Sequence, residues 1–340
     1  MFGAASSHRT RQMPPLRAQP GFRANVRPIF ILSLPRTGST LLQRILGSHE
    51  AIATTSEPWF LLPLVYSLRE SGVRAEYEHG AMARGTRGFA SEYLPGGVPS
   101  YLAAVHDFSI RLYSEAAGPK PYFLDKTPRY HHIAADLISL FAEGRFIFLW
   151  RHPLAVAASF IETWGAGGWN LDAFSADLFR GLQSLLEAYR ANEQKVVSIR
   201  YEDLVAQPHT EVDRLLGYLE LPLDTTLVDR FPELEMKNRG FWDPHAQRYD
   251  GVSHELVDKW KSIMTNPIRK AWCRRYLRWL GADRLASMGY RIEELLAEVN
   301  AMPSDMRWLR SDIGHVLAGI RSRRLRAQVL ETSFPLWRPR

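Results

Sequence analysis

The stretch "FILSLPRTGSTLLQRIL", which begins at Phe30, is the feature that most restricts the fold of this chain. An apolar run is followed by a tight polar turn and then by leucine and isoleucine at helical spacing. If the apolar run is a buried strand and the leucine-rich run a helix, Gly38, Ser39 and Thr40 lie at the helix start. Backbone N–H groups and the helix dipole favour an anion there. The stretch therefore predicts a phosphate-binding loop.

The loop differs from the version that binds nucleoside triphosphates. In that version, G-x-x-x-x-G-K-[ST], the lysine reaches the β- and γ-phosphates and the hydroxyl holds magnesium. Here Ser33 replaces the first glycine and Ser39 replaces the lysine. A magnesium-holding aspartate is also expected after an apolar strand such as "FIFLW", where this chain has Arg151. We therefore expect a phosphate ligand held by arginines and hydroxyls, with no metal ligand in the site.

Apolar runs alternate with helical patterns along the chain, the helical patterns including residues 154–164 and 171–194. This alternation predicts an α/β fold with a central parallel sheet and helices on both faces. Ligands bind such sheets beyond the carboxyl ends of the strands, so the residues after each strand are the candidate site. The predicted strands are Ile29–Leu34, Ala51–Thr55, Tyr122–Leu124, Phe146–Trp150 and Val196–Tyr201.

The composition is that of an ordinary globular protein. Its 340 residues, 46% of them hydrophobic, suffice for one large domain or two small ones. No apolar stretch approaches the roughly 20 residues that cross a bilayer, and the N-terminus lacks the apolar core of a signal peptide. The single cysteine, Cys273, suits a reducing compartment and is expected to be buried and inert. We expect a cytoplasmic protein.

The net charge of +7 lies at the two ends of the chain. Residues 1–27 contain five arginines and no acidic residue, and residues 306–340 contain eight arginines against two acidic residues. Since a nucleic-acid reader carries its positive charge on the folded face, no nucleic-acid partner is expected. We predict a disordered basic arm over residues 1–27 and a basic helical extension over residues 301–340. That helix either packs on the domain or docks at the inner membrane face.

The chain resembles the sulfotransferases that use 3′-phosphoadenosine 5′-phosphosulfate (PAPS), in particular the branch with the tyrosylprotein and many bacterial enzymes. "PRTGSTLLQRIL" resembles the loop that binds the 5′-phosphosulfate, and "RFIFLWRHPLAVAASF" resembles the element that binds the 3′-phosphate. "EPWF", "DKTP", "IRYEDLVAQP" and "GVSHELVDKWK" add to the likeness, which covers about residues 28–290. The resemblance implies a P-loop, nucleoside-kinase-like sulfotransferase domain, which we assign to residues 28–300.

The resemblance also implies which residues bind PAPS. The 5′-phosphosulfate would lie in the loop, the 3′-phosphate on an arginine and a serine eight residues later, and the nucleotide under a late closing segment. The candidates, in that order, are Arg36, Thr37, Gly38, Ser39 and Thr40; Arg151 and Ser159, with Tyr201 near the 3′-phosphate or adenine; and Ser253, Lys259 and Lys261.

Three residues are candidates for the chemistry itself. Glu57 matches the acceptor-facing glutamate that acts as general base in this branch. Lys126 matches a lysine near the sulfonate, where it would neutralise the leaving oxygen, and Arg36 would contact the sulfonate. Other readings stay open, because Glu57 could be a helix-start acid and Lys126 could pair with Asp125 or a surface acid.

Other conspicuous residues have plainer interpretations. His131 and His132 are adjacent and are expected to point to different faces, which makes a poor joint metal site. His152 is expected to be structural, at a helix start. The segment "TWGAGGWN", residues 163–170, is either an ordinary connection or a mobile lip over the acceptor.

The sequence thus predicts transfer of a sulfonate from PAPS to an acceptor hydroxyl, first of all on a carbohydrate or glycolipid. A protein tyrosine or a small metabolite is the alternative acceptor. A phosphate-transferring kinase is disfavoured by the missing lysine and aspartate. A protein that binds the nucleotide as a sensor or scaffold, without catalysis, remains the alternative of another class.

Overall fold

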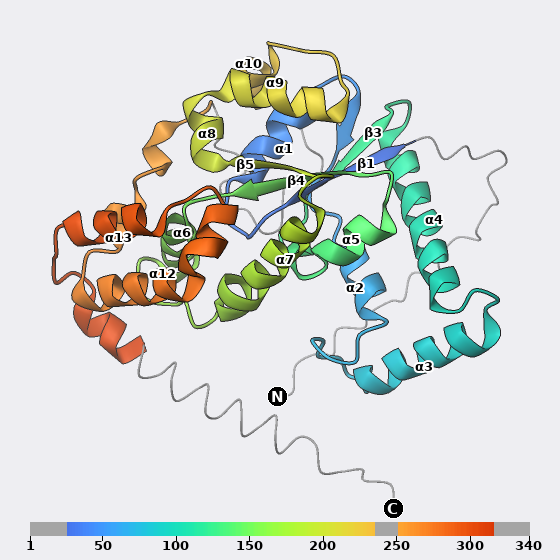
Figure 1. Cartoon of the computed structure of the whole chain (residues 1–340), viewed down its shortest axis with the longest axis horizontal. Coiled ribbons are helices and arrows are strands. Elements are labelled where there is room, and N and C mark those ends of the chain that lie inside the picture. The colour runs from blue at the N-terminus through green and yellow to red at the C-terminus, as the bar shows by residue number, and fades with distance from the viewer. Residues whose placement is uncertain (1–25, 235–250, 316–340) are drawn as a thin grey trace, which may run out of the picture.

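The computed structural model describes residues 26–234 and 251–315 of the chain, around a parallel sheet of five strands. The strand order is β2-β3-β1-β4-β5 (Figure 1), and each observed strand agrees with a predicted one to within two residues at either end. The predicted α/β fold is therefore confirmed. The strands are β1 (Arg27–Leu32), β2 (Ile52–Thr54), β3 (Tyr122–Asp125), β4 (Arg145–Trp150) and β5 (Val197–Arg200).

Helices fill most of the connections between the strands. The α-helices are α1 (Ser39–Gly47), α2 (Leu61–Tyr66), α3 (His79–Tyr93), α4 (Val98–Ala117), α5 (Ala134–Leu140), α6 (Pro153–Gly165), α7 (Leu182–Asn192), α8 (Tyr201–Ala206), α9 (Pro208–Leu219), α10 (Leu227–Arg230), α11 (Trp260–Ile263), α12 (Pro267–Ser287) and α13 (Ile292–Ala301). Short 3₁₀ turns are η1 (Tyr130–His132), η3 (Phe231–Glu233) and η4 (His254–Leu256), and η2 (Ala176–Gly181) is a π-helical turn.

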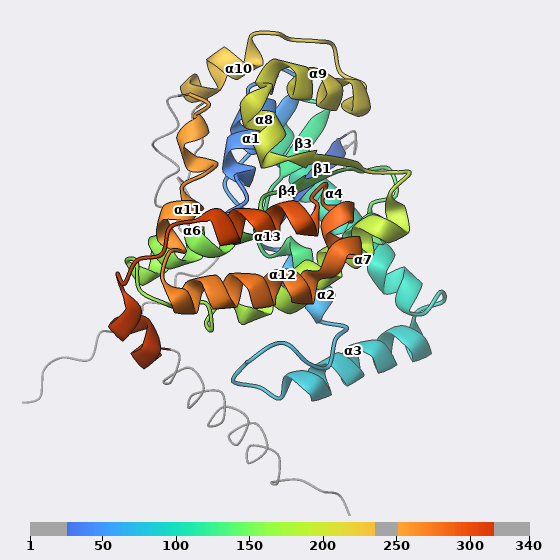
Figure 2. The ribbon, with the colours of Figure 1, turned by 60° about the vertical axis from the view of Figure 1, so that its left-hand side comes forward.

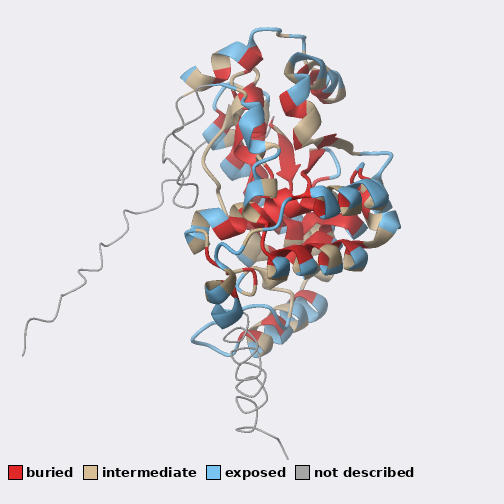
Figure 3. Cartoon of the chain, turned by 90° about the vertical axis from the view of Figure 1, so that its left-hand side faces the viewer, coloured by how far each residue is buried: buried red, intermediate tan, exposed pale blue. Residues whose placement is uncertain are grey.

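The sheet is covered on both faces, as a parallel sheet requires. In β1, Phe30 and Leu32 pack on one face against α4, α5, α6, α7 and α12, whereas Ile29 and Ile31 pack on the other against α1, α8 and α9. Figure 2 shows the two helical layers, and Figure 3 shows the buried strands between helices whose outer surfaces are exposed. This double burial explains why the strands read as continuous apolar runs.

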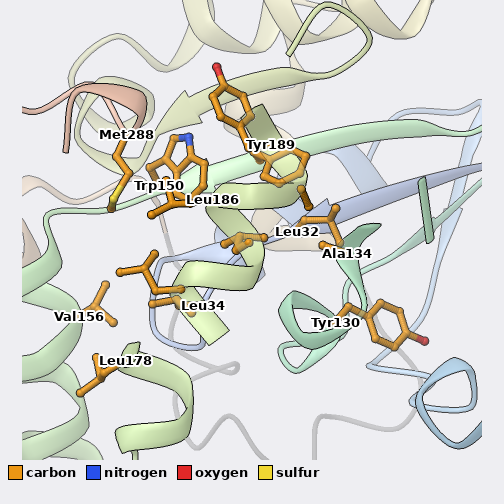
Figure 4. Packing of buried hydrophobic residues seen from close by; sticks show 14 of the residues in the cluster. Leu32, Leu34, Tyr130, Ala134, Trp150, Val156, Leu178, Leu186, Tyr189 and Met288 are labelled. Atoms are coloured by element: carbon orange, nitrogen blue, oxygen red, sulfur yellow. The ribbon is translucent and has the colours of Figure 1, made fainter. Parts of the chain in front are cut away.

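The helical pattern predicted for residues 171–194 forms the π-helical turn η2 followed by α7. Its predicted buried face is confirmed, since Leu178, Leu182, Leu185 and Leu186 are all buried. Figure 4 shows Leu178 and Leu186 in the same cluster as Leu34 of the phosphate-binding loop. The loop is thus anchored from behind by this core.

The two basic ends lie largely outside the described residues. Residues 1–25 of the arm predicted for residues 1–27 and most of the predicted basic helix, residues 316–340, lie outside the described residues. The predicted end of the arm is wrong by two residues, since Val26 is buried and Arg27 begins β1. Within the described part, Asp312 is fully buried, with its Oδ2 2.6 Å from Arg269 Nε of α12. No helix among the described residues is long and apolar enough to span a membrane. Cys273 is buried as predicted, and burial raises the pKa of its thiol to about 12.

Candidate active site

The candidate residues gather at the carboxyl ends of the strands, as the parallel sheet predicts. The phosphate-binding loop follows β1 and leads into α1, and Glu57 lies three residues after β2. Lys126, Arg151 and Tyr201 directly follow β3, β4 and β5. Sequence reasoning therefore placed these groups at the correct edge of the sheet.

Gly38 precedes α1 with φ of 91°, a left-handed conformation that glycine adopts readily. A Cβ atom at this position would lie 2.4 Å from Cδ2 of Tyr201, so the ring of Tyr201 packs directly on the glycine. Ser39 and Thr40 begin the helix, where backbone N–H groups lack intrahelical acceptors. The local geometry is that of an anion-binding helix start.

The loop borders a first cavity of about 750 Å³. Arg151 lies in its wall, where one guanidinium N–H group donates to the carbonyl of Arg36 (3.0 Å) and another to the carbonyl of Leu256 (2.7 Å). The guanidinium carbon lies 4.4 Å from the ring centre of Tyr201. Ser253 lines the same cavity. These residues come from four separate parts of the chain.

Ser159 connects the two motifs on which the resemblance rests. Its Oγ accepts a hydrogen bond of 3.1 Å from Nε of Arg36, a loop residue with φ of 69°. The guanidinium carbon of Arg36 also lies 5.5 Å from the ring centre of Trp164, in the segment predicted as a connection or a lip. Arg36 therefore links the loop, helix α6 and the end of that helix.

A second cavity, of about 610 Å³, lies on the other side of the loop. It shares Arg36, Ser39 and Thr40 with the first cavity, and Glu57 and Lys126 line it. The phosphate-binding loop is thus the common wall of two cavities.

Glu57 and Lys126 form a buried ion pair in the second cavity. Lys126 Nζ donates to Glu57 Oε1 at 2.7 Å and lies 3.4 Å from Thr40 Oγ1. Glu57 is not in the first turn of α2, which begins at Leu61, and Lys126 pairs with Glu57 rather than with Asp125. Glu57 is therefore not a helix-start acid, and the partner of Lys126 is neither Asp125 nor a surface acid.

Two residues beside this pair were missed by sequence reasoning. Trp59 has φ of 62°, which is unusual for a tryptophan, and its Nε1 donates to Glu57 Oε2 at 3.2 Å. Asp125 is fully buried and accepts hydrogen bonds from the hydroxyls of Tyr113, Tyr130 and Thr127, and burial raises the pKa of its carboxyl to about 6. The position of Asp125 at the end of an apolar strand was the available signal, whereas no residue pattern reveals the backbone of Trp59.

The structure does not bring every candidate into a cavity. Thr37 is buried and donates to the carbonyl of Leu34 at 2.8 Å, which stabilises the loop from within. Lys261 borders neither cavity and pairs with Asp258 and Glu298. Lys259 does line the first cavity, with its Nζ 2.5 Å from Glu162.

The prediction that His131 and His132 point to different faces is wrong. The tight turn η1 brings their ring centres to 4.1 Å, and the ligand atoms of both residues and of Asp177 lie within 4.8 Å of one another. Gly181 leaves room for His131, since a Cβ atom at position 181 would lie 2.4 Å from Cδ2 of His131. Arg129 already supplies a cation 2.7 Å from Asp177, so ion pairing accounts for the cluster.

His152 is a structural residue in this geometry, in agreement with the sequence. Its Nδ1 accepts a hydrogen bond from the Leu154 N–H at the start of α6, and its ring stacks on Trp260 at 4.5 Å. Burial, together with the charges of Lys261 and Arg151, lowers the pKa of His152 to about 3. The ring is therefore neutral at physiological pH.

The parallel sheet and the loop that leads from β1 into α1 define a protein with a P-loop-like fold. The chain belongs to the sulfotransferase family, whose family pattern matches residues 28–225, more than half of its length. The family predicted from the motifs is therefore confirmed.

Named relatives are similar to this chain over part of their length. Nodulation protein NoeE of Sinorhizobium fredii is 31% identical over 288 residues, covering 77% of this chain and 65% of NoeE. The protein-tyrosine sulfotransferase of Drosophila melanogaster is 23% identical over 205 residues, covering 59% and 39%. The solved structure of the sulfotransferase domain of the Synechococcus PCC 7002 olefin synthase aligns with a TM-score of 0.49 at 26% identity. The alignment covers 74% of this chain and 93% of that domain. This chain thus spans less than two thirds of these two curated relatives.

Proposed function

We propose that this chain transfers the sulfonate of PAPS to an acceptor hydroxyl. The observation that carries the proposal is the common wall of the two cavities, formed by Arg36, Ser39 and Thr40. A nucleotide in the first cavity with its 5′-phosphosulfate on this loop would present the sulfonate to the second cavity. Glu57 and Lys126 lie in that second cavity.

The first cavity offers groups that suit the two anionic ends of PAPS. Arg151 has a buried Nε with no hydrogen-bond partner, although its other guanidinium nitrogens donate to carbonyls. A buried N–H of this kind is satisfied by an anion, and arginine binds phosphate with forked hydrogen bonds. We assign Arg151 and Ser159 to the 3′-phosphate, Tyr201 to the adjoining nucleoside, and Ser253 and Lys259 to the opposite wall.

In the proposed reaction, the acceptor oxygen attacks sulfur while the bond from sulfur to the 5′-phosphate oxygen breaks. Glu57 takes the proton of the attacking hydroxyl. Lys126, which contacts both Glu57 and Thr40, neutralises the charge on the departing oxygen. Arg36 and the N–H groups at the start of α1 stabilise the sulfonate oxygens. The products are the sulfated acceptor and adenosine 3′,5′-bisphosphate.

For the acceptor we favour a carbohydrate or glycolipid hydroxyl, with a protein tyrosine or a small metabolite as the alternative. Trp59 and Trp164 line the second cavity and provide flat aromatic faces. Non-catalytic nucleotide binding is less well supported, because Glu57 borders the same loop. We place the reaction in the cytoplasm.

The test has two stages. Adenosine 3′,5′-bisphosphate should raise the thermal midpoint of unfolding without added metal, and ATP with magnesium should raise it much less. PAPS labelled with ³⁵S is then incubated with extracts of the source cell and either the wild-type chain or Glu57→Gln. Label transferred by the wild type and lost in the variant supports the proposal, whereas a larger stabilisation by ATP contradicts it.

A further inference from the structure

The second cavity, which the proposed function assigns to the acceptor, has two chemically different ends. One end is formed by the phosphate-binding loop with Glu57 and Lys126. The remainder is lined largely by apolar and aromatic side chains from α2, the following loop and α3. The side chains that matter here are Leu62, Pro63, Tyr66, Val73, Tyr77 and Met82.

The apolar end offers few carboxylate or amide partners for the hydroxyls of a free sugar. Among the described residues that line the cavity there is no asparagine, glutamine or aspartate, and Glu57 is the only carboxylate. Arg129 pairs with Asp177, and His79 Nε2 lies 2.9 Å from the Arg69 carbonyl, which leaves His79 Nδ1 without a hydrogen-bond partner in the described part of the chain. Sugar hydroxyls buried here would lose hydrogen bonds to water, which costs free energy.

The opening of this end is also apolar. Val73 is 38% exposed and Tyr77 is 59% exposed, although both line the cavity. An apolar group that runs from Leu62 and Met82 past these two side chains would remove their surfaces from water. The surface is thus shaped for a ligand with an apolar section.

We propose that the acceptor is an amphiphile, whose reacting hydroxyl lies within a short distance of an alkyl or acyl chain. This inference rests on the proposed function and specifies its acceptor class. The reacting hydroxyl of the ligand lies at Glu57, and its alkyl or acyl chain occupies the end of the cavity lined by Leu62, Tyr66 and Met82. A free oligosaccharide and a tyrosine peptide are the competing acceptors.

The test compares methyl, butyl and octyl β-glucosides, all below their micellar concentrations. Binding is measured by calorimetry with adenosine 3′,5′-bisphosphate present, and turnover is measured with PAPS. Affinity should rise about three- to fourfold for each added CH₂ until the apolar end is filled, and KM should fall in parallel. Affinity that is independent of chain length overturns the inference, as does a free oligosaccharide or tyrosine peptide with a lower KM than the octyl glucoside.

Two substitutions, each by a polar residue of similar size, test where the alkyl chain of the ligand lies. Leu62→Asn and Met82→Gln should reduce the preference for octyl over methyl glucoside at least tenfold and leave affinity for the bisphosphate unchanged. Leu223→Asn is the control, because Leu223 is 66% exposed and lies outside both cavities. An unchanged preference in both variants overturns the placement. Binding that depends on alkyl-chain length without any transfer from PAPS would support an amphiphile as the ligand of this cavity, but would contradict its role as acceptor and with it the proposed function.

Discussion

Lys126 Nζ lies 2.7 Å from Glu57 Oε1, and the two side chains are only 4% and 8% exposed. Removing one member of a buried ion pair leaves the other charge without compensation, at a typical cost of about 3–5 kcal/mol. The two residues therefore act as a unit in stability as well as in the proposed chemistry.

The first prediction concerns this pair. Glu57→Gln should lower turnover by roughly 10²- to 10⁴-fold, because the amide cannot accept the acceptor proton, and should leave affinity for adenosine 3′,5′-bisphosphate unchanged. Lys126→Met should destabilise the fold, and the double variant should recover part of that loss. Activity assays, calorimetry and urea unfolding of all three variants measure the turnover, the bisphosphate affinity and the free energy of unfolding, respectively. Near-wild-type turnover in Glu57→Gln would remove the general base from the mechanism.

A second prediction concerns Trp59, whose indole N–H donates to the other oxygen of Glu57. Trp59→Phe keeps a large ring but removes a hydrogen bond to a charged group, worth about 1.5–3 kcal/mol. Turnover should therefore fall roughly 10- to 100-fold with bisphosphate binding intact. Trp169→Phe is the matched control, since Trp169 is buried outside both cavities. Equal losses in the two variants would mean that the effect is one of packing.

The sequence predicted the sheet and most of the site because apolar strands and the helix start leave strong local patterns. It could not predict the role of Trp59, which depends on a left-handed backbone, or the partner of Lys126, which depends on how β2 and β3 lie side by side. The error at His131 and His132 has a similar origin, because a tight turn brings adjacent side chains together. Lys261 is a nucleotide-binding candidate only by its place in the late segment of the sequence. In the structure it lies on α11 and forms ion pairs with Asp258 and Glu298.

A third prediction tests the close approach of Gly38 and Tyr201. Gly38→Ala introduces a Cβ 2.4 Å from the Tyr201 ring at φ of 91°, so the loop or the ring must move. Affinity for the bisphosphate should fall at least tenfold, because the strained backbone adds to the clash with the ring. Gly217→Ala is the control, since nothing lies within 4 Å of a Cβ there. Full affinity in Gly38→Ala would contradict the assignment of this turn.

The fourth prediction separates the 3′-phosphate from the rest of the nucleotide. Arg151→Ala should weaken binding of adenosine 3′,5′-bisphosphate by roughly 10- to 100-fold. Binding of adenosine 5′-phosphosulfate, which has no 3′-phosphate, should change little. Arg214→Ala, whose side chain pairs with Glu211 away from both cavities, is the control. Equal weakening of the two ligands would show that Arg151 does not contact the 3′-phosphate.

The last prediction concerns His152. Burial lowers the pKa of its ring from the ordinary value of 6.5 to about 3. Because the folded state disfavours the charged ring, His152 contributes stability above pH 6.5 that is lost as the pH falls toward 3. The expected loss is about 1.4 kcal/mol for each pH unit below 6.5.

His152→Asn isolates this effect, since asparagine can still cap α6 and does not titrate. The wild type should lose about 2 kcal/mol of unfolding free energy relative to this variant between pH 7 and pH 5. Urea unfolding at several pH values measures the difference, and the exposed His209→Asn is the control for replacing a histidine. The loss of the Trp260 contact in His152→Asn adds a cost that does not depend on pH, so only the slope against pH is diagnostic. A constant difference between wild type and His152→Asn across this range would mean that the pKa of His152 is the same in the folded and unfolded states, which would contradict the prediction.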